Sequence, residues 1–386
     1  MSANALPNLD SPNFCPELWQ RAFVLQLNSE FLVKPCCYAS PSPSNQVRVT
    51  DSNKIFETYN QSPQVQKMRS DNFNQKLDAG CQVCLHEEKV SGVSGRTRAL
   101  EQARSQSNQV TLSSHVDLNL GNLCNLACAI CDPNSSTSWS PVHMKMYNKE
   151  WGAADARYKK NDRPMINDPE WFANIQVLQL QGGEVFMQRA YTEFFANMQR
   201  YRDLKEIEVR IFTNGTVLPD PELFALLSQC KYVSIFFSID DMGTRFEYQR
   251  HGGRWSQVLD NLKWFIDNCG SNFDLGIHPT YSLLNVYYLA ELQQFFAEHF
   301  PRLQRKFGPY HIGTGPCSAH ALPSGIKQAI VDRLQHIPEL AFLSSAITAD
   351  ESYNSTEFLD YISKYNSAIN NSYAHTHPEF WKILTA

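Results

Sequence analysis

The sequence predicts an α/β fold, a partial (β/α)6 TIM-like barrel with an N-terminal domain that contains a β-hairpin. Two observations predict the barrel: after His115, short apolar runs alternate with helical stretches, and six such runs occur. A third observation predicts the hairpin, because apolar residues alternate on both sides of a short polar turn before residue 37.

Six strands and four helices form the expected barrel. The strands are predicted at residues 115–121, 175–181, 207–213, 232–239, 273–281 and about 307–313. The helices are predicted at residues 190–201, 221–229, 255–268 and 286–300. In parallel α/β architectures the chemistry lies beyond the carboxyl ends of the strands, so the loops after the strands are the expected site.

The N-terminal domain begins with the hairpin at residues 14–37. Its turn is Asn28-Ser29-Glu30, and a helix is expected at residues 63–77. The polar stretch at 89–114 predicts a connection between domains. We therefore divide the chain into an N-terminal domain at 1–112, a barrel at 113–316 and a C-terminal helical segment at 317–386, in which no motif is found.

Composition excludes several classes of protein. Hydrophobic residues make up 42% and charged residues 19% of the 386 residues, which is ordinary for a globular protein. A net charge of −5 without a long basic run gives no field for a polyanion, so no nucleic-acid partner is expected. No apolar stretch is long enough for a membrane span or a signal peptide, and we expect a cytoplasmic protein with no membrane partner.

The chain has eleven cysteines, which need an explanation in a reducing compartment. Eight of the eleven lie before residue 132 in two groups. The other three, Cys230, Cys269 and Cys317, stand alone, and an isolated cysteine is more often a small buried apolar residue than a ligand. The grouped cysteines therefore predict metal or iron-sulfur ligation.

Cys124, Cys128 and Cys131 lie within eight residues, directly after the first strand of the barrel. Three thiolates on a [4Fe-4S] cluster leave one iron without a protein ligand, and a small molecule can bind there. Zinc is the alternative, but a structural zinc site needs four ligands, and no fourth Cys or His is near in sequence. The spacing therefore favours a catalytic [4Fe-4S] cluster.

The spacing Cys-x3-Cys-x2-Cys resembles the signature of the radical S-adenosylmethionine (SAM) superfamily. Motifs at successive strand ends are similar to those of the family, in the same order. The resemblance implies that Gly182, Gly183 and Glu184 bind the amino group of SAM, and that further cofactor contacts come from Thr213, Asn214, Ser238 and Asp240.

Three more residues match family positions, each with a structural alternative. Arg250 lies in a stretch, Tyr248 to Gly253, that resembles the entry to the family's fourth helix. The resemblance implies a pair with the SAM carboxylate, whereas the alternative is a local structural contact. Ser282 and Asn285 match positions near adenosine or ribose, and their alternative is a turn with a helix cap.

The second group of cysteines comprises Cys15, Cys36, Cys37, Cys81 and Cys84. Together with the hairpin it resembles the auxiliary-cluster element of the twitch and SPASM subfamilies, although here the element precedes the barrel. The likeness includes Glu87, Gly92, residues 94–96 and residues 135–139, but the turn is Asn-Ser-Glu where that group usually has Asp-Gly. The resemblance implies a second [4Fe-4S] cluster, for which we favour Cys15, Cys36, Cys81 and Cys84 as ligands, with Cys37 as the alternative to Cys36. A structural four-cysteine zinc module is the other possibility.

The resemblance implies an oxidoreductase or modifying enzyme that cleaves SAM reductively and abstracts hydrogen from a substrate. Peptide modification is the leading activity, dehydrogenation of a small alcohol or amine follows, and RNA modification is third. An external electron donor of the flavodoxin or ferredoxin type is implied, and no side chain is assigned a catalytic role. The alternative to an enzyme is a non-catalytic metal-binding scaffold. The ordered motifs after Cys131 disfavour this alternative.

Overall fold

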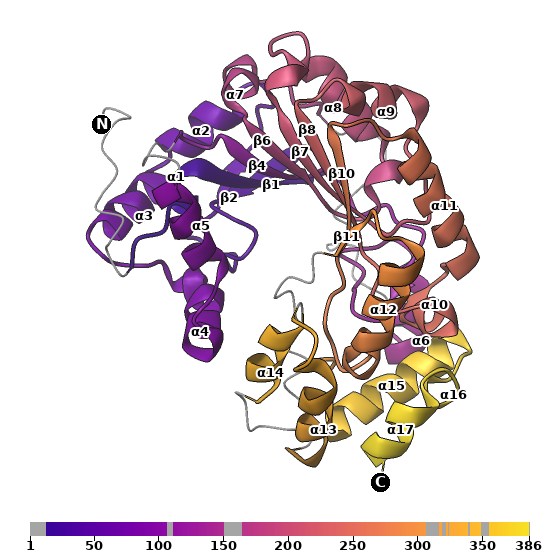
Figure 1. The fold of residues 1–386 in the computed structure, drawn as a ribbon. Coiled ribbons are helices and arrows are strands. Elements are labelled where there is room, and N and C mark those ends of the chain that lie inside the picture. Colours follow the sequence, from indigo (N-terminus) through magenta and orange to yellow (C-terminus); the bar gives the residue numbers. More distant parts are fainter. Residues whose placement is uncertain are drawn as a thin grey trace.

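A mostly parallel sheet forms the centre of the molecule (Figure 1). The computed structural model describes residues 13–105, 111–149, 164–305, 316–318, 322, 324–338, 340–348 and 355–385. The nine strands lie in the order β11-β10-β8-β7-β6-β4-β1-β2-β3. Their bounds are β1 Arg21–Leu27, β2 Glu30–Lys34, β3 Val47–Val49, β4 His115–Asn119, β6 Val177–Leu180, β7 Glu208–Thr213, β8 Tyr232–Phe237, β10 Phe273–Ile277 and β11 Gln304–Arg305.

The predicted partial barrel is confirmed. Strands β4, β6, β7, β8 and β10 are consecutive parallel neighbours, and each lies inside a range that the sequence predicts. β11 extends the sheet in parallel beyond β10. The strand predicted at about 307–313 lies outside the described residues.

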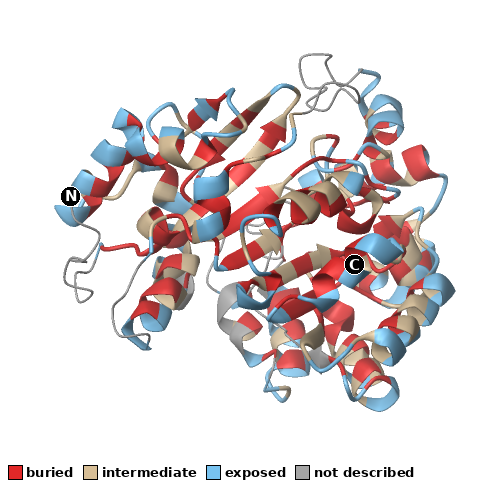
Figure 2. Cartoon of the chain, turned by 90° about the horizontal axis from the view of Figure 1, so that it is seen from above, coloured by how far each residue is buried: buried red, intermediate tan, exposed pale blue. Residues whose placement is uncertain are grey.

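Helices follow the strands and cover the convex face of the sheet (Figure 1). Those of the barrel are α7 Pro169–Asn174, α8 Arg189–Met198, α9 Pro221–Ser228, α10 Gly243–Gln249, α11 Trp255–Asn268 and α12 Leu289–His299. The residues that face these helices are apolar and fully buried, as Val209 and Ile211 of β7 illustrate. Figure 2 shows buried residues along the strands and on helix sides that face them. Burial of this apolar face supplies the main driving force for the fold.

The hairpin is also confirmed, but it belongs to the barrel sheet. β1 and β2 are antiparallel, and β1 pairs in parallel with β4, so that Phe23 lies opposite Asp117. The sheet therefore contains strands from both sides of the predicted domain boundary at residue 112. The division into domains stays a prediction. The polar stretch 89–114 contains helix α5 (Gly95–Ser105), whose Ala99, Leu100 and Ala103 are buried, where the sequence predicts only a connection.

The remaining helices lie toward the two ends of the chain, except α6, which follows the cysteine loop (Figure 1). The N-terminal ones are α1 Glu17–Gln20, α2 Ile55–Gln61, α3 Pro63–Phe73 and α4 Gln82–Ser91. The later ones are α6 Trp139–Tyr147, α13 Ser324–Leu334, α14 Ala341–Thr348, α15 Ser355–Ile369, α16 Tyr373–Thr376 and α17 Pro378–Thr385. Within the described part of the chain, no helix has the length and apolar character needed to cross a membrane.

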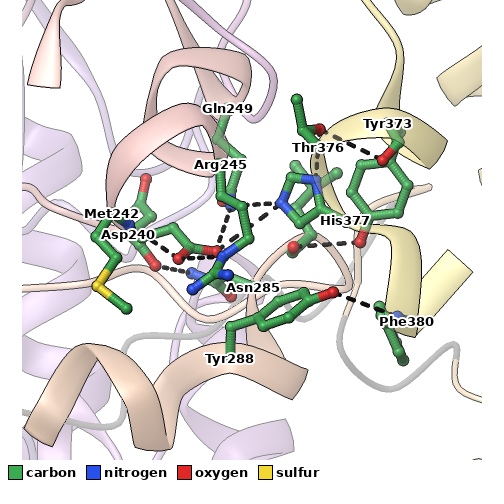
Figure 3. Close-up of polar contacts among 12 residues, drawn as sticks. Asp240, Met242, Arg245, Gln249, Asn285, Tyr288, Tyr373, Thr376, His377 and Phe380 are labelled. Carbon is green, nitrogen blue, oxygen red and sulfur yellow. Dashed lines mark hydrogen bonds and ion pairs between the residues drawn. The ribbon is translucent and has the colours of Figure 1, made fainter.

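A buried polar network attaches the C-terminal helices to the barrel (Figure 3). His377 and Asp241 are both fully buried, and their Nε2 and Oδ2 atoms are 3.9 Å apart. Gln249 Nε2 donates to Asp241 Oδ2 at 3.1 Å, and the Arg245 guanidinium pairs with Asp241 at 2.8 Å. Because buried polar groups are costly unless they are paired, these contacts fix how the C-terminal segment docks.

The two acid-base groups of this network have shifted pKa values. Burial raises the pKa of Asp241 to about 7, although Arg245 lowers it, and burial lowers the pKa of His377 to about 3. The stabilising effect of Asp241 is therefore present below its unfolded pKa and lost as pH rises through 7. The effect of His377 has the opposite sign, because it is lost as pH falls through the unfolded pKa of about 6.5.

We predict that the two effects oppose each other between about pH 4 and 6.5, and that single variants separate them. Relative to wild type, the free energy of unfolding of Asp241→Asn rises with pH, and that of His377→Gln falls, by up to about 1.4 kcal/mol per pH unit. Urea unfolding at several pH values from about 5 to 6.5 measures both slopes. Profiles parallel to wild type in both variants contradict the assignment.

Candidate functional site

The three-cysteine loop follows β4 and is held against the barrel by a second, two-stranded sheet. In this sheet β5 (Ala127–Cys128) pairs with β9 (Arg250–His251), and Cys128 lies opposite Arg250. Cys124 and Cys128 are buried, and Cys131 is partly exposed. The pairing brings the predicted cluster ligands together with the stretch around Arg250, which is more than a hundred residues away in sequence.

Two sulfur atoms of the loop accept hydrogen bonds. The Leu126 N–H and the Asn214 side chain donate to Cys124 Sγ at 3.5 and 3.8 Å. Arg250 donates to Cys128 Sγ at 3.7 Å. Donors of this kind stabilise thiolates and tune the reduction potential of an iron-sulfur cluster, so the surroundings fit such a group.

The pKa values of the free thiols of Cys124 and Cys128 are raised, so metal binding must offset the cost of deprotonating them. Burial raises the pKa of Cys124 to about 11. A hydrogen bond with Cys131 and then burial raise the pKa of Cys128, against the effect of Arg250, which lowers it. Because only thiolates bind iron, the positive charge of a cluster core has to offset these effects.

Two side-chain donors after the loop bind its carbonyls, a hydroxyl and an indole N–H. Ser138 Oγ donates to the Cys124 carbonyl at 2.8 Å, and Trp139 Nε1 donates to the Cys128 carbonyl at 2.7 Å. These two residues belong to the 135–139 stretch quoted in the family resemblance. Their positions give that stretch a structural role as a support for the cysteine loop.

Two tyrosines of α15 also hold the loop, and no motif in the sequence predicts this contact. Tyr365 donates to the Ala127 carbonyl at 2.7 Å, and Tyr361 donates to the Ala129 carbonyl. The Tyr365 ring stacks on Trp139 with 5.9 Å between centroids. The C-terminal segment is thus part of the site's support, although it carries no recognisable motif.

Gly182 and Gly183 allow a close approach of protein to protein. Both have positive φ, 95° and 53°. A Cβ on Gly182 would lie 2.1 Å from the Asn119 side chain, and one on Gly183 would lie 2.4 Å from the Leu123 carbonyl oxygen. The glycines therefore pack the loop after β6 against the end of β4 and against the cysteine loop, whereas the sequence suggests close approach to a ligand.

The Glu184 carboxylate is fully buried and links two strand ends. Its oxygens accept hydrogen bonds from Thr213 Oγ1 and from the Asn214 N–H, both at 2.7 Å. Burial raises the pKa of Glu184, and these donors lower it. Glu184 thus orients Thr213 and Asn214, and its expected contact with SAM stays a prediction.

Arg250 and Asp240 form a buried ion pair of 2.7 Å. The other Asp240 oxygen accepts from the Thr280 N–H at 2.8 Å. Ser238, two residues earlier, donates its backbone N–H to the Thr213 carbonyl at 2.8 Å. The local structural contact considered for Arg250 is therefore present, and a contact of any of these residues with SAM stays a prediction.

Ser282 and Asn285 form a turn at the start of the η5 helix (Val286–Tyr288). The Ser282 N–H donates to Asn285 Oδ1 at 2.9 Å, and Asn285 Nδ2 donates to the Asp240 carbonyl at 3.0 Å (Figure 3). Both side chains are almost completely buried. The turn that the sequence offers as the alternative is present, and their role beside adenosine or ribose stays a prediction.

The N-terminal thiols influence one another electrostatically. Burial raises the pKa of Cys15, and the charges of Glu17, Cys81 and Cys84 raise it further. Burial raises the pKa of Cys81 to about 11, with Asp78 and Cys84 contributing. The helix that carries Cys84 is tied to the start of the chain, because Arg96 pairs with Glu88 and donates to the Phe14 carbonyl at 3.0 Å.

The two adjacent cysteines differ in their surroundings. Burial raises the pKa of Cys36, and the charges of Cys37 and Cys15 add to this effect. Burial raises the pKa of Cys37 to about 12, with Asp117 as the next cause, and a hydrogen bond from Cys37 lowers the pKa of Asp117. The pKa of Cys36 is thus affected by the neighbouring thiols Cys37 and Cys15. The pKa of Cys37 is affected most, after burial, by Asp117 of the barrel.

Within the described ranges, no group of three or more His, Cys, Asp or Glu side chains converges as the ligands of a metal ion do. All eleven cysteines are free thiols. In a [4Fe-4S] cluster each thiolate binds a different iron, so its ligands are spread more widely than those of a single ion.

The central part of this chain is similar to one known family. Residues 118–281, which include the cysteine loop and the strand-end motifs, match the radical SAM superfamily. This family implies a [4Fe-4S] cluster and SAM. A search of curated proteins finds no match.

Several solved structures have a low similarity to this chain. One is anSMEcpe with bound AdoMet and Cp18Cys peptide, at 17% identity and TM-score 0.36, covering 61% of each chain. Another is SuiB of Streptococcus suis bound to the precursor peptide SuiA, at 14% identity and TM-score 0.34, covering 74% of this chain and 60% of that one. A further anSMEcpe structure with AdoMet has 16% identity and TM-score 0.32, with 47% of each chain covered. This chain thus spans about half to three fifths of their lengths.

Glu184→Ala is predicted to weaken SAM binding about tenfold or more while the iron content stays unchanged. The carboxylate orients Thr213 and Asn214, and none of the three loop thiols is its hydrogen-bond partner. Loss of two buried hydrogen bonds to a charged group is worth several kcal/mol, enough for this effect. Equilibrium dialysis with SAM and iron analysis of the same samples measure both quantities.

Glu184→Gln is the matched variant, because it keeps one acceptor for Thr213 and turns an NH2 group toward the Asn214 N–H. We expect an intermediate loss of SAM affinity. If iron is lost together with SAM binding in both variants, Glu184 supports the cysteine loop itself and has no separate role at the SAM site.

Proposed function

We propose that this chain is a radical SAM enzyme that cleaves SAM reductively and abstracts hydrogen from a peptide or small-molecule substrate. The observation that carries the proposal is the match of residues 118–281 to the radical SAM superfamily, within which the three cysteines occupy one supported loop. A [4Fe-4S] cluster bound there supplies the electron that breaks a carbon-sulfur bond of SAM and gives a 5′-deoxyadenosyl radical.

The chain's own residues hold and surround the reactants. Cys124, Cys128 and Cys131 are the proposed cluster ligands, and the N–H groups directed at Cys124 and Cys128 stabilise their thiolates. Gly182, Gly183, Glu184, Thr213, Asn214, Ser238, Asp240, Arg250, Ser282 and Asn285 are the proposed SAM-site residues. Because most of these polar side chains are already buried and hydrogen-bonded to protein, they form a rigid frame around the strand ends.

We further propose that Cys15, Cys36, Cys81 and Cys84 bind an auxiliary [4Fe-4S] cluster. The charges of Cys81 and Cys84 act on Cys15, and that of Cys15 acts on Cys36, whereas the first charge effect on Cys37 comes from Asp117; this supports the choice of Cys36. Removal of one hydrogen atom leaves a carbon radical, and a second cluster can accept the remaining electron in an oxidation or cross-link. An external donor of the flavodoxin or ferredoxin type completes the electron supply, and the cytoplasm is the proposed location.

Anaerobic protein incubated with dithionite and SAM is predicted to yield 5′-deoxyadenosine, detected by chromatography and mass spectrometry. The Cys124→Ala, Cys128→Ala, Cys131→Ala variant removes the thiolates of the SAM-binding cluster and is expected to give none. Cys269→Ala is the matched control, since this isolated thiol is far from the loop in sequence and ends α11. Equal yields from wild type and the triple variant exclude the proposal.

The Cys81→Ala, Cys84→Ala variant is predicted to keep SAM cleavage and to lose the auxiliary cluster. A cluster with four thiolates has no open iron for SAM, so its removal leaves the first step intact. After reconstitution the iron content is expected to fall from about eight to about four per chain, with little finished product. About one zinc per wild-type chain, and about four irons, points to the structural zinc module instead. Normal circular dichroism with no 5′-deoxyadenosine means that the two sites are coupled structurally.

A further inference from the structure

A polar cavity of about 490 Å³ lies on the concave face of the sheet. One wall is lined by Gln179 of β6, by Gln181 just after this strand, and by Arg210 and Phe212 of β7, and residues of α5 line another. The volume is in the range of small-molecule and peptide sites. None of the proposed cluster or SAM ligands explains why this wall is polar.

The strand register explains which side chains reach the cavity. Asp117, Gln179, Arg210 and Ser234 are successive partners across β4, β6, β7 and β8, so they form one layer on the same face. The neighbours of Arg210 on its own strand, Val209 and Ile211, are fully buried in the opposite, apolar face. Because side chains alternate along a strand, Arg210 is directed into the cavity.

Arg210 has no carboxylate partner. Among the residues that the structure describes, its guanidinium makes no ion pair, whereas the nearby Arg21 pairs with Glu17 at 2.5 Å and Asp117 at 3.7 Å. Glu208, on the same strand as Arg210, pairs with Lys231 at 2.8 Å. A partly buried cation without a counter-ion favours an anion beside it.

A second group in the same cavity also lacks a partner. Within the described part of the chain, the side-chain nitrogen of Gln181 is buried and has no hydrogen-bond acceptor. An amide nitrogen and a guanidinium both donate and do not accept. A buried amide nitrogen just after β6 and a guanidinium on β7 that makes no ion pair among the described residues therefore point to a ligand with acceptor oxygens.

We propose that this cavity binds a carboxylate of the substrate, with Arg210 as its main partner and Gln181 as the second donor. This inference rests on the proposed function, because it identifies the substrate of that site. A carboxylate fits the planar guanidinium in a bidentate pair. Glu17 lines the same space, and its negative charge disfavours a dianion such as a phosphate monoester.

The position of Arg210 along its strand limits the substrate further. Arg210 lies three positions before Thr213, the last residue of β7, which corresponds to roughly 10 Å of strand. The reacting carbon is expected beyond the strand ends, beside the SAM-site residues. The carboxylate and this carbon are thus about three extended residues apart, as in a peptide near its C-terminus.

The test measures binding of N-acetyl-trialanine and its C-terminal amide to reconstituted full-length protein without reductant, by calorimetry. The two probes differ in one negative charge, and no SAM cleavage is needed, so this test and the 5′-deoxyadenosine assay fail independently. We expect the acid to bind at least tenfold more tightly than the amide. Equal affinities, or no binding of the acid at 10 mM, overturn the proposal.

Variants assign the effect to Arg210. Arg210→Gln is expected to abolish the difference in affinity between acid and amide. Arg210→Lys is expected to keep part of this difference, because the positive charge remains while the bidentate geometry of the guanidinium is lost. Arg200→Gln, at an exposed site after α8, is the matched control and should behave as wild type. An unchanged preference for the acid in Arg210→Gln overturns the assignment.

If N-acetylglycine binds as well as the peptide, the substrate is a small carboxylic acid. Weaker binding identifies a peptide C-terminus.

Discussion

The buried carboxylate of Glu184 connects the parts of the site that lie far apart in sequence. It accepts hydrogen bonds from Thr213 and Asn214 at the end of β7, and Asn214 in turn donates to Cys124 Sγ. A fully buried carboxylate is stable only when donors surround it, so the ends of β6 and β7 must stay in register. The packing of Gly183 against Leu123 places the cysteine loop beside these strand ends.

The loop is held from several directions because its own sequence cannot fix it. Its short β5 strand pairs with β9, Ser138 and Trp139 bind its carbonyls, and Tyr365 reaches it from the C-terminal helices. The C-terminal helices are themselves attached through the buried Asp241 and His377 network. A site that must bind a large cofactor with defined geometry benefits from this kind of rigid support.

The two faces of the central sheet have different chemistry, and this difference separates stability from function. The face toward the helices is apolar and closes the core, while the other face carries Asp117, Gln179 and Arg210 in one layer. β1 extends the sheet and brings Arg21 and the nearby Cys37 to the same cavity. The N-terminal region, which carries the second group of thiols, therefore borders the cavity where we propose that the substrate binds.

The sequence by itself determined the strands of the barrel, the hairpin and the residues of the cysteine loop, because these depend on local periodicity and spacing. It did not reveal that β1 pairs with β4, since pairing between distant strands leaves no local pattern. Nor did it predict the contacts of Tyr361 and Tyr365 with the loop carbonyls, because a tyrosine in an amphipathic helix is also consistent with simple packing. The roles of Gly182 and Gly183 and the unpaired charge of Arg210 were likewise decided by the tertiary structure. Only the folded chain shows which neighbour a Cβ would meet and which carboxylates are already paired.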